Sequence, residues 1–325
     1  MKLTFVKTAI ALFAAMSLSP SAFAQTAPYP DKPLSIVVHS GAGSGTDLFA
    51  RAIAEILKND QIVSVPITIE NRTGGSGAVA INYLISQKGN ADTLWMTTSS
   101  VVLAQPRRAK IDVNYTDFTP IALLAADPIV VAVRTDAPYA TLDDLVAAAK
   151  AEPKKVRAGI SAIGGGGHIG LGILSSATGV EFSYVPFASG GEAAAALLGG
   201  HVDVVMENPG EMLSLLEAKR LRSLAVTTSE RLPDLAETPT LKELGVDVDY
   251  EIGRAIFMPG DVPADVKAFW QDAFKRLVET EAWQKFVKEN QLISKYRTGE
   301  VYDEYLASQQ GALLGALEKL GVLKD

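Results

Sequence analysis

The sequence contains no cysteine among its 325 residues, and this absence excludes several kinds of chemistry. Without thiols the chain forms no disulfide, has no cysteine nucleophile and offers no cysteine for lipid attachment. Histidine is scarce as well: only three are present, and none belongs to an H-E-x-x-H motif. Because zinc sites are built mainly from cysteine and histidine, we expect no metal site.

The chain also lacks an excess of positive charge. Its 30 Lys and Arg residues stand against 37 Asp and Glu residues, which gives a formal charge of −7. Nucleic acids and anionic membrane surfaces are bound by concentrated lysine and arginine, so we expect neither as a partner. A small anionic ligand is not excluded, because a binding pocket depends on local dipoles rather than on net charge.

Long apolar runs are missing beyond the N-terminus. There, Lys2 and Lys7 precede an apolar run of about residues 9–18, and the small residues Ala22 and Ala24 follow. This pattern predicts a secretory signal peptide over residues 1–24, and the run is too short for the ~20 residues of a membrane anchor. Cleavage after Ala24 removes two lysines and no acid, so the formal charge moves from −7 to −9. Export without a lipid anchor predicts a soluble protein in a Gram-negative periplasm.

Short apolar segments alternate with helical segments along the mature chain. Strand, loop and helix follow one another from residue 34 onward, and amphipathic helices run through Trp270 and Trp283 to Leu323. This alternation predicts an α/β protein with mainly parallel sheets between helices. Roughly 300 residues exceed one comfortable hydrophobic core, so we expect two lobes.

Five predicted strands end in loops of glycine, serine or threonine that lead into helices. They span residues 40–47, 73–77, 161–167, 189–191 and 207–210. In open α/β sheets, ligands bind beyond the carboxyl ends of the strands, and helix N-termini favour anions. Each loop taken alone is more simply a turn with a helix cap. The five together favour a binding site.

Sequence motifs of catalysis and nucleotide binding are weak or missing. No G-x-x-x-x-G-K-[ST] motif occurs, and the closest approach to G-x-S-x-G fails at Ala78. A G-x-G-x-x-G pattern begins at Gly165, but the next predicted strand does not end in the ribose-binding acid. We therefore expect a binding protein without a cofactor. A hydrolase that uses Ser76 or Ser161 with His168 is the less favoured alternative.

Four charged or titratable residues are further candidates for ligand contact. Asp47 lies near a helix start, where it can complement the helix dipole or face a ligand. His168 follows four glycines at another helix start, where it either points into the cleft or caps the backbone. Glu207 would repel a carboxylate unless it accepts a hydrogen bond from a hydroxyl or ammonium group. Arg254 can pair with a ligand carboxylate, although an ion pair within the hinge is the favoured interpretation.

Several short motifs, in a specific order and spacing, carry a resemblance to a known family. They include YPDKP at 29–33, ENRTGGSG at 70–77, DFTPI at 117–121, VPF at 185–187, LGGHVD at 198–203 and LAVT at 224–227. The chain resembles the periplasmic receptors of tripartite tricarboxylate transporters, the TctC and Bordetella uptake (Bug) family, over essentially the whole mature sequence. It departs from them at residues 39–43, where prolines are usual, and at Thr73.

The resemblance implies a two-lobed, clam-like receptor of the periplasmic binding protein type that closes on a small organic carboxylate. One lobe would comprise residues 25–125 plus 252–325 and the other residues 126–251, with two hinge crossings. Its partners would be the permease subunits of the transporter, or alternatively a sensor kinase, and we expect it to act as a monomer. Carried over by position, the resemblance implies these ligand-binding residues: Ser40, Gly41, Ser44, Gly45, Thr46, Asp47, Ser76, Gly77, Ser99, Ser161, His168, Ser189 and Asn208. Arg254 is added to them as a further candidate.

Overall fold

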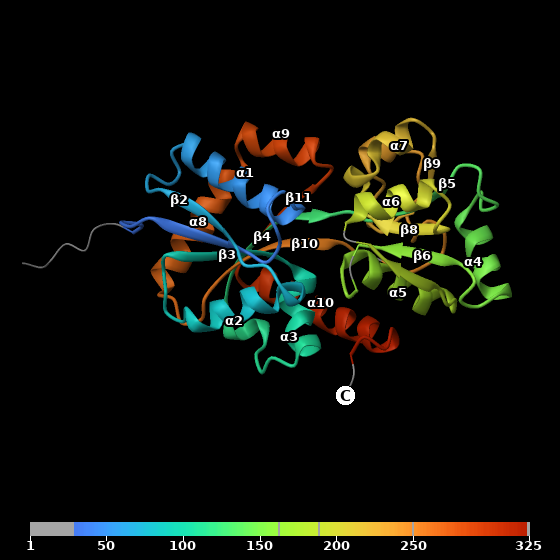
Figure 1. Ribbon diagram of the computed structural model, residues 1–325. Helices are drawn as coiled ribbons and strands as arrows, with labels where there is room; N and C mark the ends of the chain where they lie inside the picture. Colours follow the sequence, from blue (N-terminus) through green and yellow to red (C-terminus); the bar gives the residue numbers. More distant parts are fainter. Residues whose placement is uncertain (1–28, 162, 188, 249, 324–325) are drawn as a thin grey trace, which may run out of the picture.

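The computed structural model describes residues 29–161, 163–187, 189–248 and 250–323. Its elements form two lobes that lie side by side, each built around one sheet (Figure 1). The signal peptide predicted over residues 1–24 lies outside the described residues.

The first sheet has six strands in the order β11, β4, β10, β3, β1, β2. Their bounds are β1 Leu34–Val38, β2 Ile67–Asn71, β3 Thr93–Thr98, β4 Thr119–Asp127, β10 Ile252–Met258 and β11 Ile293–Arg297. The helices α1 (Gly45–Asn59), α8 (Ala264–Val278) and α9 (Glu281–Glu289) cover one face, and α2 (Ala78–Ser86), α3 (Ser99–Ala109) and α10 (Gly299–Lys319) cover the other (Figure 1).

The second sheet has five strands in the order β7, β6, β8, β5, β9. Their bounds are β5 Val130–Arg134, β6 Arg157–Ile160, β7 Ser183–Pro186, β8 Val204–Glu207 and β9 Leu221–Val226. The helices of this lobe are α4 (Leu142–Ala151), α5 (Gly166–Thr178), α6 (Gly190–Leu198) and α7 (Leu213–Glu217).

Both sheets are mixed, whereas the sequence predicts mainly parallel sheets. In the first sheet β1 pairs in parallel with β2 and β3, but β10 and β11 run antiparallel to their neighbours. In the second sheet β6 pairs in parallel with β7 and β8, and β5 runs antiparallel to β8 and β9. The antiparallel pairs involve the strands that carry the chain between lobes, and these strands have no crossover helix to impose parallel pairing.

The chain passes between the lobes at two adjacent places. It leaves the first sheet at the end of β4 and returns through residues 227–252 into β10. The two passages are tied together at Thr227, whose N–H donates to Ile129 O at 3.0 Å and whose carbonyl accepts from Tyr250 N at 3.0 Å. The predicted alternation of strands and helices in two lobes is confirmed.

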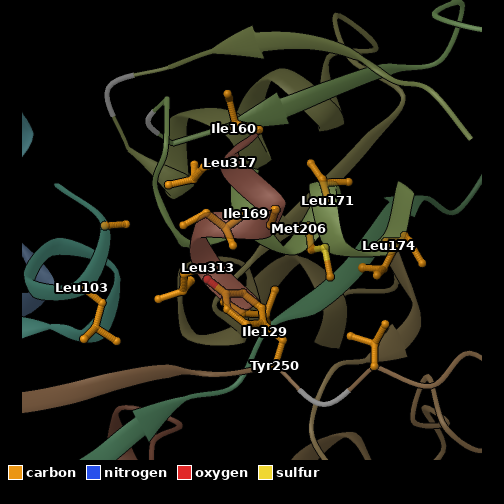
Figure 2. Packing of buried hydrophobic residues seen from close by; sticks show 14 of the residues in the cluster. Leu103, Ile129, Ile160, Ile169, Leu171, Leu174, Met206, Tyr250, Leu313 and Leu317 are labelled. Carbon is orange, nitrogen blue, oxygen red and sulfur yellow. The ribbon is translucent and has the colours of Figure 1, made fainter. Parts of the chain in front are cut away.

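One apolar cluster crosses from lobe to lobe. Leu313 and Leu317 of α10 pack into the same buried group as Ile160, Ile169 and Leu174 of the second lobe (Figure 2). The C-terminal helix, which covers a face of the first sheet, therefore also contacts α5. Burying a leucine or isoleucine side chain contributes about 1.5–3 kcal/mol, so this contact is a substantial third connection between the lobes.

Two elements differ from the sequence prediction. Residues 99–109 form α3, although Pro106 lies inside it and no helix is expected there. Residues 293–297 form β11 at the sheet edge, inside a region predicted as helical throughout. Helix α3 forms despite its proline because Pro106 is buried in the folded protein, where tertiary packing outweighs the local tendency of proline to end a helix. Strand β11 is too short for its alternating pattern to be recognised between two helices.

Candidate functional site

A cavity of about 360 Å³ opens between the two lobes at the carboxyl ends of several strands. Elements of both lobes contribute its lining: the starts of α1, α3 and α5, the ends of β4 and β8, and strand β10. This volume lies within the range of pockets that hold small molecules.

The first loop, between β1 and α1, is held in shape by Asp47. Its buried carboxylate accepts hydrogen bonds from Gly43 N at 2.8 Å, from Asn71 Nδ2 at 2.9 Å and from the Arg51 guanidinium at 3.0 Å. The bonds from Arg51, together with those from Gly43 and Asn71, lower the pKa of Asp47 to about 2. Asp47 therefore organises the loop from behind the cavity, while the loop's hydroxyl groups face it.

The hydroxyls of this loop are linked to one another. Ser44 is the N-cap of α1, and its Oγ accepts from Asp47 N at 3.3 Å. The Ser40 and Ser44 oxygens lie 2.6 Å apart. Gly45 and Thr46 follow in the first turn of the helix, and all but Asp47 of these residues line the cavity. A helix N-terminus with hydroxyl groups around it is suited to an anion.

The second loop places Ser76 at the cavity in a left-handed conformation, with φ 53° and ψ 36°. Gly77 follows with φ 106°, and a β-carbon on it would lie 2.7 Å from Val101 Cγ1. Only glycine can adopt this positive φ and leave room for the Val101 side chain. Gly77 thus positions Ser76 without lining the cavity itself.

Arg254 of β10 is paired within the protein. Its Nη2 donates to Asp127 Oδ1 at 2.9 Å, and its Nε lies 2.8 Å from Asp127 Oδ2. Asn208 of the second lobe donates to the same Oδ1 at 3.0 Å. The two side chains of the ion pair are 12% and 4% exposed, so the charges neutralise each other in a largely dry site. Asp127 thereby links both lobes at the hinge.

Glu207, at the end of β8, is bonded to the neighbouring loop. Its Oε1 accepts from Ser161 N at 2.8 Å, and its Oε2 accepts from Ser161 Oγ at 3.1 Å. Burial, together with the nearby Glu211, raises the pKa of Glu207 to about 8. A carboxyl group therefore occupies hydrogen-bond donors that a ligand anion would otherwise use.

Two histidines near the cavity are neutral at physiological pH. His39 lines it, with Nδ1 3.2 Å from Thr97 Oγ1, and burial with the Arg254 charge lowers its pKa to about 4. His168 is buried behind the lining, where its Nδ1 accepts from Gly164 N at 2.9 Å. Burial and the Arg108 charge lower the pKa of His168 to about 4. His168 thus caps the loop before α5.

Of the fourteen residues expected from the sequence, eight line the cavity: Ser40, Ser44, Gly45, Thr46, Ser76, Ser161, Asn208 and Arg254. The other six lie behind or beside it: Gly41, Asp47, Gly77, Ser99, His168 and Ser189. Ser99 Oγ accepts from Gly253 N at 3.0 Å and so ties α3 to β10. Ser189 caps α6 through Glu192 N. These two serines serve the backbone.

Arg108, Asp127 and Glu211 also line the cavity, and they were not expected. Arg108 comes from the last turn of α3, the helix that the sequence does not predict. Asp127 stands before Pro128 between two apolar segments, which is a detectable sign of a chain crossing. Glu211 follows the 207–210 loop by one residue. No sequence pattern marks Arg108.

The geometry of a serine hydrolase is not assembled among the described residues. Ser161 Oγ bonds to Glu207, and His168 Nδ1 is taken by Gly164 N–H. Neither Ser76 nor Ser161 hydrogen bonds to a histidine. Among these same residues, no group of three metal-ligating side chains is found. The helices in the described part of the chain are all too short or too polar to cross a bilayer.

The fold and the cavity between its lobes define a two-lobed solute-binding protein of the periplasmic type. The family model described as the tripartite tricarboxylate transporter family receptor, TctC, matches residues 49–317. The chain belongs to this family, whose members are periplasmic solute-binding receptors.

Individual relatives agree with that assignment. Protein BugT of Bordetella pertussis is 28% identical over 220 residues, which cover 67% of each chain. The crystal structure of a TctC solute-binding protein from Polaromonas superimposes with a TM-score of 0.77 at 27% identity, covering 90% of this chain and 99% of that one. An R. palustris protein with adipate has the same fold, with a TM-score of 0.78 at 24% identity and coverage of 90% and 98%. The predicted family is confirmed.

Proposed function

We propose that this chain is a periplasmic receptor that binds a small organic carboxylate between its lobes and delivers it to the membrane subunits of a tripartite tricarboxylate transporter. It acts by binding and does not catalyse a reaction. The moving bodies are residues 25–125 plus 252–325 and residues 126–251. The signal peptide of residues 1–24 directs the chain to the periplasm.

The observation that carries this proposal is the lining of the inter-lobe cavity. The start of α1 and the start of α5 both border it, and hydroxyl groups of Ser40, Ser44, Thr46 and Ser76 surround the first of these. Such neutral donors can replace the water around a carboxylate without a mismatched buried charge. The adipate in the R. palustris protein of the same fold supports a carboxylate ligand.

Ligand binding is expected to favour closure of the two lobes. A ligand held by both lobes stabilises the closed state, whereas one held by a single lobe shifts nothing. Gly166 at the start of α5 lies against the side chain of Ile252 on β10, and a β-carbon there would be 1.8 Å from Ile252 Cδ1. The lobes thus meet closely at this side of the cavity.

Thermal unfolding with a panel of organic carboxylates tests the binding. A ligand present at ~100 times its dissociation constant stabilises the folded state by ~2.7 kcal/mol. The variant Ser40→Ala should weaken binding about 10- to 150-fold, since a hydrogen bond to a charged group contributes about 1.5–3 kcal/mol. Ser86→Ala, an exposed hydroxyl far from the cavity, is the matched control. A panel in which only sugars shift the transition would refute the carboxylate assignment.

Delivery is tested in a strain that lacks the receptor. Uptake of the identified ligand should fall and return when the chain is supplied, and the mature protein should begin at Gln25 by mass. Unchanged uptake with a lost transcriptional response would instead assign the receptor to a sensor kinase.

A further inference from the structure

Most polar groups of the cavity are already satisfied by the protein. The Asn208 amide donates to Asp127, and its Oδ1 accepts from Gly210 N at 2.7 Å. Ser161 is bonded through both N–H and Oγ to Glu207. The charge of Arg254 is balanced by Asp127. A ligand must therefore find its charged contacts elsewhere in the lining.

Arg108 is the first of two charged residues of the cavity lining that have no ion-pair partner among the described residues. It is half-buried at the end of α3, and its Nη1 donates to Gln105 Oε1 at 3.1 Å. A β-carbon on Gly164 would lie 2.9 Å from the same Nη1, so the guanidinium extends across the cleft to the loop before α5. No ion pair engages Arg108 within the part of the chain that the structure describes. Its charge is available to a carboxylate.

Glu211 is the second remaining charge, and it lies on the other lobe. It belongs to the short turn Pro209–Glu211 after β8, lines the cavity and is exposed to solvent. Its carboxyl has no hydrogen-bond or ion-pair partner among the described residues. Partial burial and the Asp127 carboxylate raise the pKa of Glu211, and the Arg254 charge, which is itself paired with Asp127, opposes this effect only in part. A further positive charge beside Glu211 would favour its ionised form.

The two walls of the cleft therefore differ in chemistry. The first lobe offers hydroxyl groups, the N-terminus of α1 and the unpaired Arg108, which favour a negative group, and the start of α5 on the second lobe borders the same cavity. The second lobe presents the carboxyl group of Glu211, which can accept hydrogen bonds, whereas the buried Glu207 is bonded to Ser161 and its pKa is raised to about 8. A second carboxylate on the ligand would meet the Glu211 carboxylate and be repelled, whereas a cationic donor would be held.

We propose, on the basis of the function proposed above, that the cleft selects a carboxylate that also carries an ammonium group. The carboxylate lies against Arg108 and the ammonium group against Glu211, so the ligand spans the two lobes. An amino acid zwitterion has this arrangement of charges. Its near-zero net charge matches a cavity whose two free charges are of opposite sign.

Calorimetric titration with matched probes tests the proposal. The probes are the common amino acids, their 2-hydroxy analogues, their deaminated analogues and the dicarboxylates from succinate to adipate. We expect at least one amino acid to bind about tenfold or more tightly than its 2-hydroxy and deaminated analogues. Glu211→Gln should remove that preference by weakening the amino acid alone, and Arg108→Gln should weaken amino acid and deaminated analogue alike.

Controls and outcomes separate this proposal from the one on which it rests. Arg108→Lys should recover part of the affinity lost in Arg108→Gln. Arg107→Gln and Glu217→Gln, exposed residues of α3 and α7, should change nothing. Tight binding of a dicarboxylate with no effect of Glu211→Gln would refute the proposal of a zwitterionic ligand but would still support the function of the chain as a carboxylate receptor. Failure of all carboxylates and amino acids to bind would overturn both.

Discussion

Replacement of Glu207 by glutamine should make the protein more stable at neutral pH. The Glu207 carboxyl is buried and accepts two hydrogen bonds from Ser161. Burial and Glu211 raise its pKa from 4.5 to about 8. Glutamine has nearly the same shape as the protonated acid, accepts from Ser161 N–H and carries no charge, so it avoids the cost of ionisation.

The sign and size of the effect follow from proton linkage. Below pH 4.5 the carboxyl is protonated in both the folded and the unfolded states, and it costs nothing. As the pH rises from 4.5 to about 8, the unfolded chain loses this proton while the folded chain keeps it, so the stability of the wild type falls. At 1.36 kcal/mol per pH unit, the loss by pH 7 is about 3 kcal/mol.

Urea unfolding of the wild type and Glu207→Gln at pH 5 and pH 7.5 measures this difference. The free energy of unfolding of the variant should exceed that of the wild type by an amount that grows as the pH rises, and this difference should become constant above pH 8. His39 and His168, whose pKa values are lowered to about 4, stabilise the fold above pH 6.5 and lose this effect toward pH 4. Their contributions cancel because both proteins contain them. A stability difference that does not change with pH would refute the reasoning, and Glu217→Gln controls for the loss of an exposed carboxyl.

Three further substitutions test the packing and the ion pairs by denaturant unfolding. Asp127→Asn should cost about 3 kcal/mol because it leaves the buried Arg254 without its partner, and a loss below 1 kcal/mol would contradict a dry ion pair. Asp47→Asn should cost about 1–2 kcal/mol at pH 7, and the difference should shrink as the pH falls from 3.8 toward 2, where the wild-type carboxylate is protonated. Leu317→Ala should cost about 2–4 kcal/mol, and equal stability would exclude α10 as a structural link between the lobes.

The strands and helices that the sequence predicts well are those with a strong local pattern. Leu34–Val38 and Ala78–Ser86 begin and end where the apolar pattern predicts. Thr141 caps α4 through Asp144 N at 3.2 Å, as its place before the helix indicates. By contrast, α3 and β11 depend on neighbours that are distant in the chain, since α3 packs against α10 and β11 pairs with β4. Local propensity therefore could not reveal them.

The binding loops follow a similar division. Glycine, serine and threonine after a strand mark the loops at 40–47, 73–77 and 161–167, because those residue types have a local role in turns and caps. The structure brings residues of all three to the cavity. Which member of each loop faces the cavity is a different matter, since it depends on the orientation of each helix start. Asp47 is in a predicted loop and His168 directly follows another, but the side chains of both bond to the backbone.

The sequence by itself determined the alternation of strands and helices, the family, the loops that border the cleft and the absence of thiol chemistry. These properties rest on residue type and local order, which are fixed along the chain. Only the tertiary structure decided the antiparallel strands at the crossings, the pairing of Arg254 with Asp127, and the approach of Arg108 and Glu211 to one cavity. Each of these depends on residues that lie far apart in the sequence, and their meeting is set by packing across the two lobes.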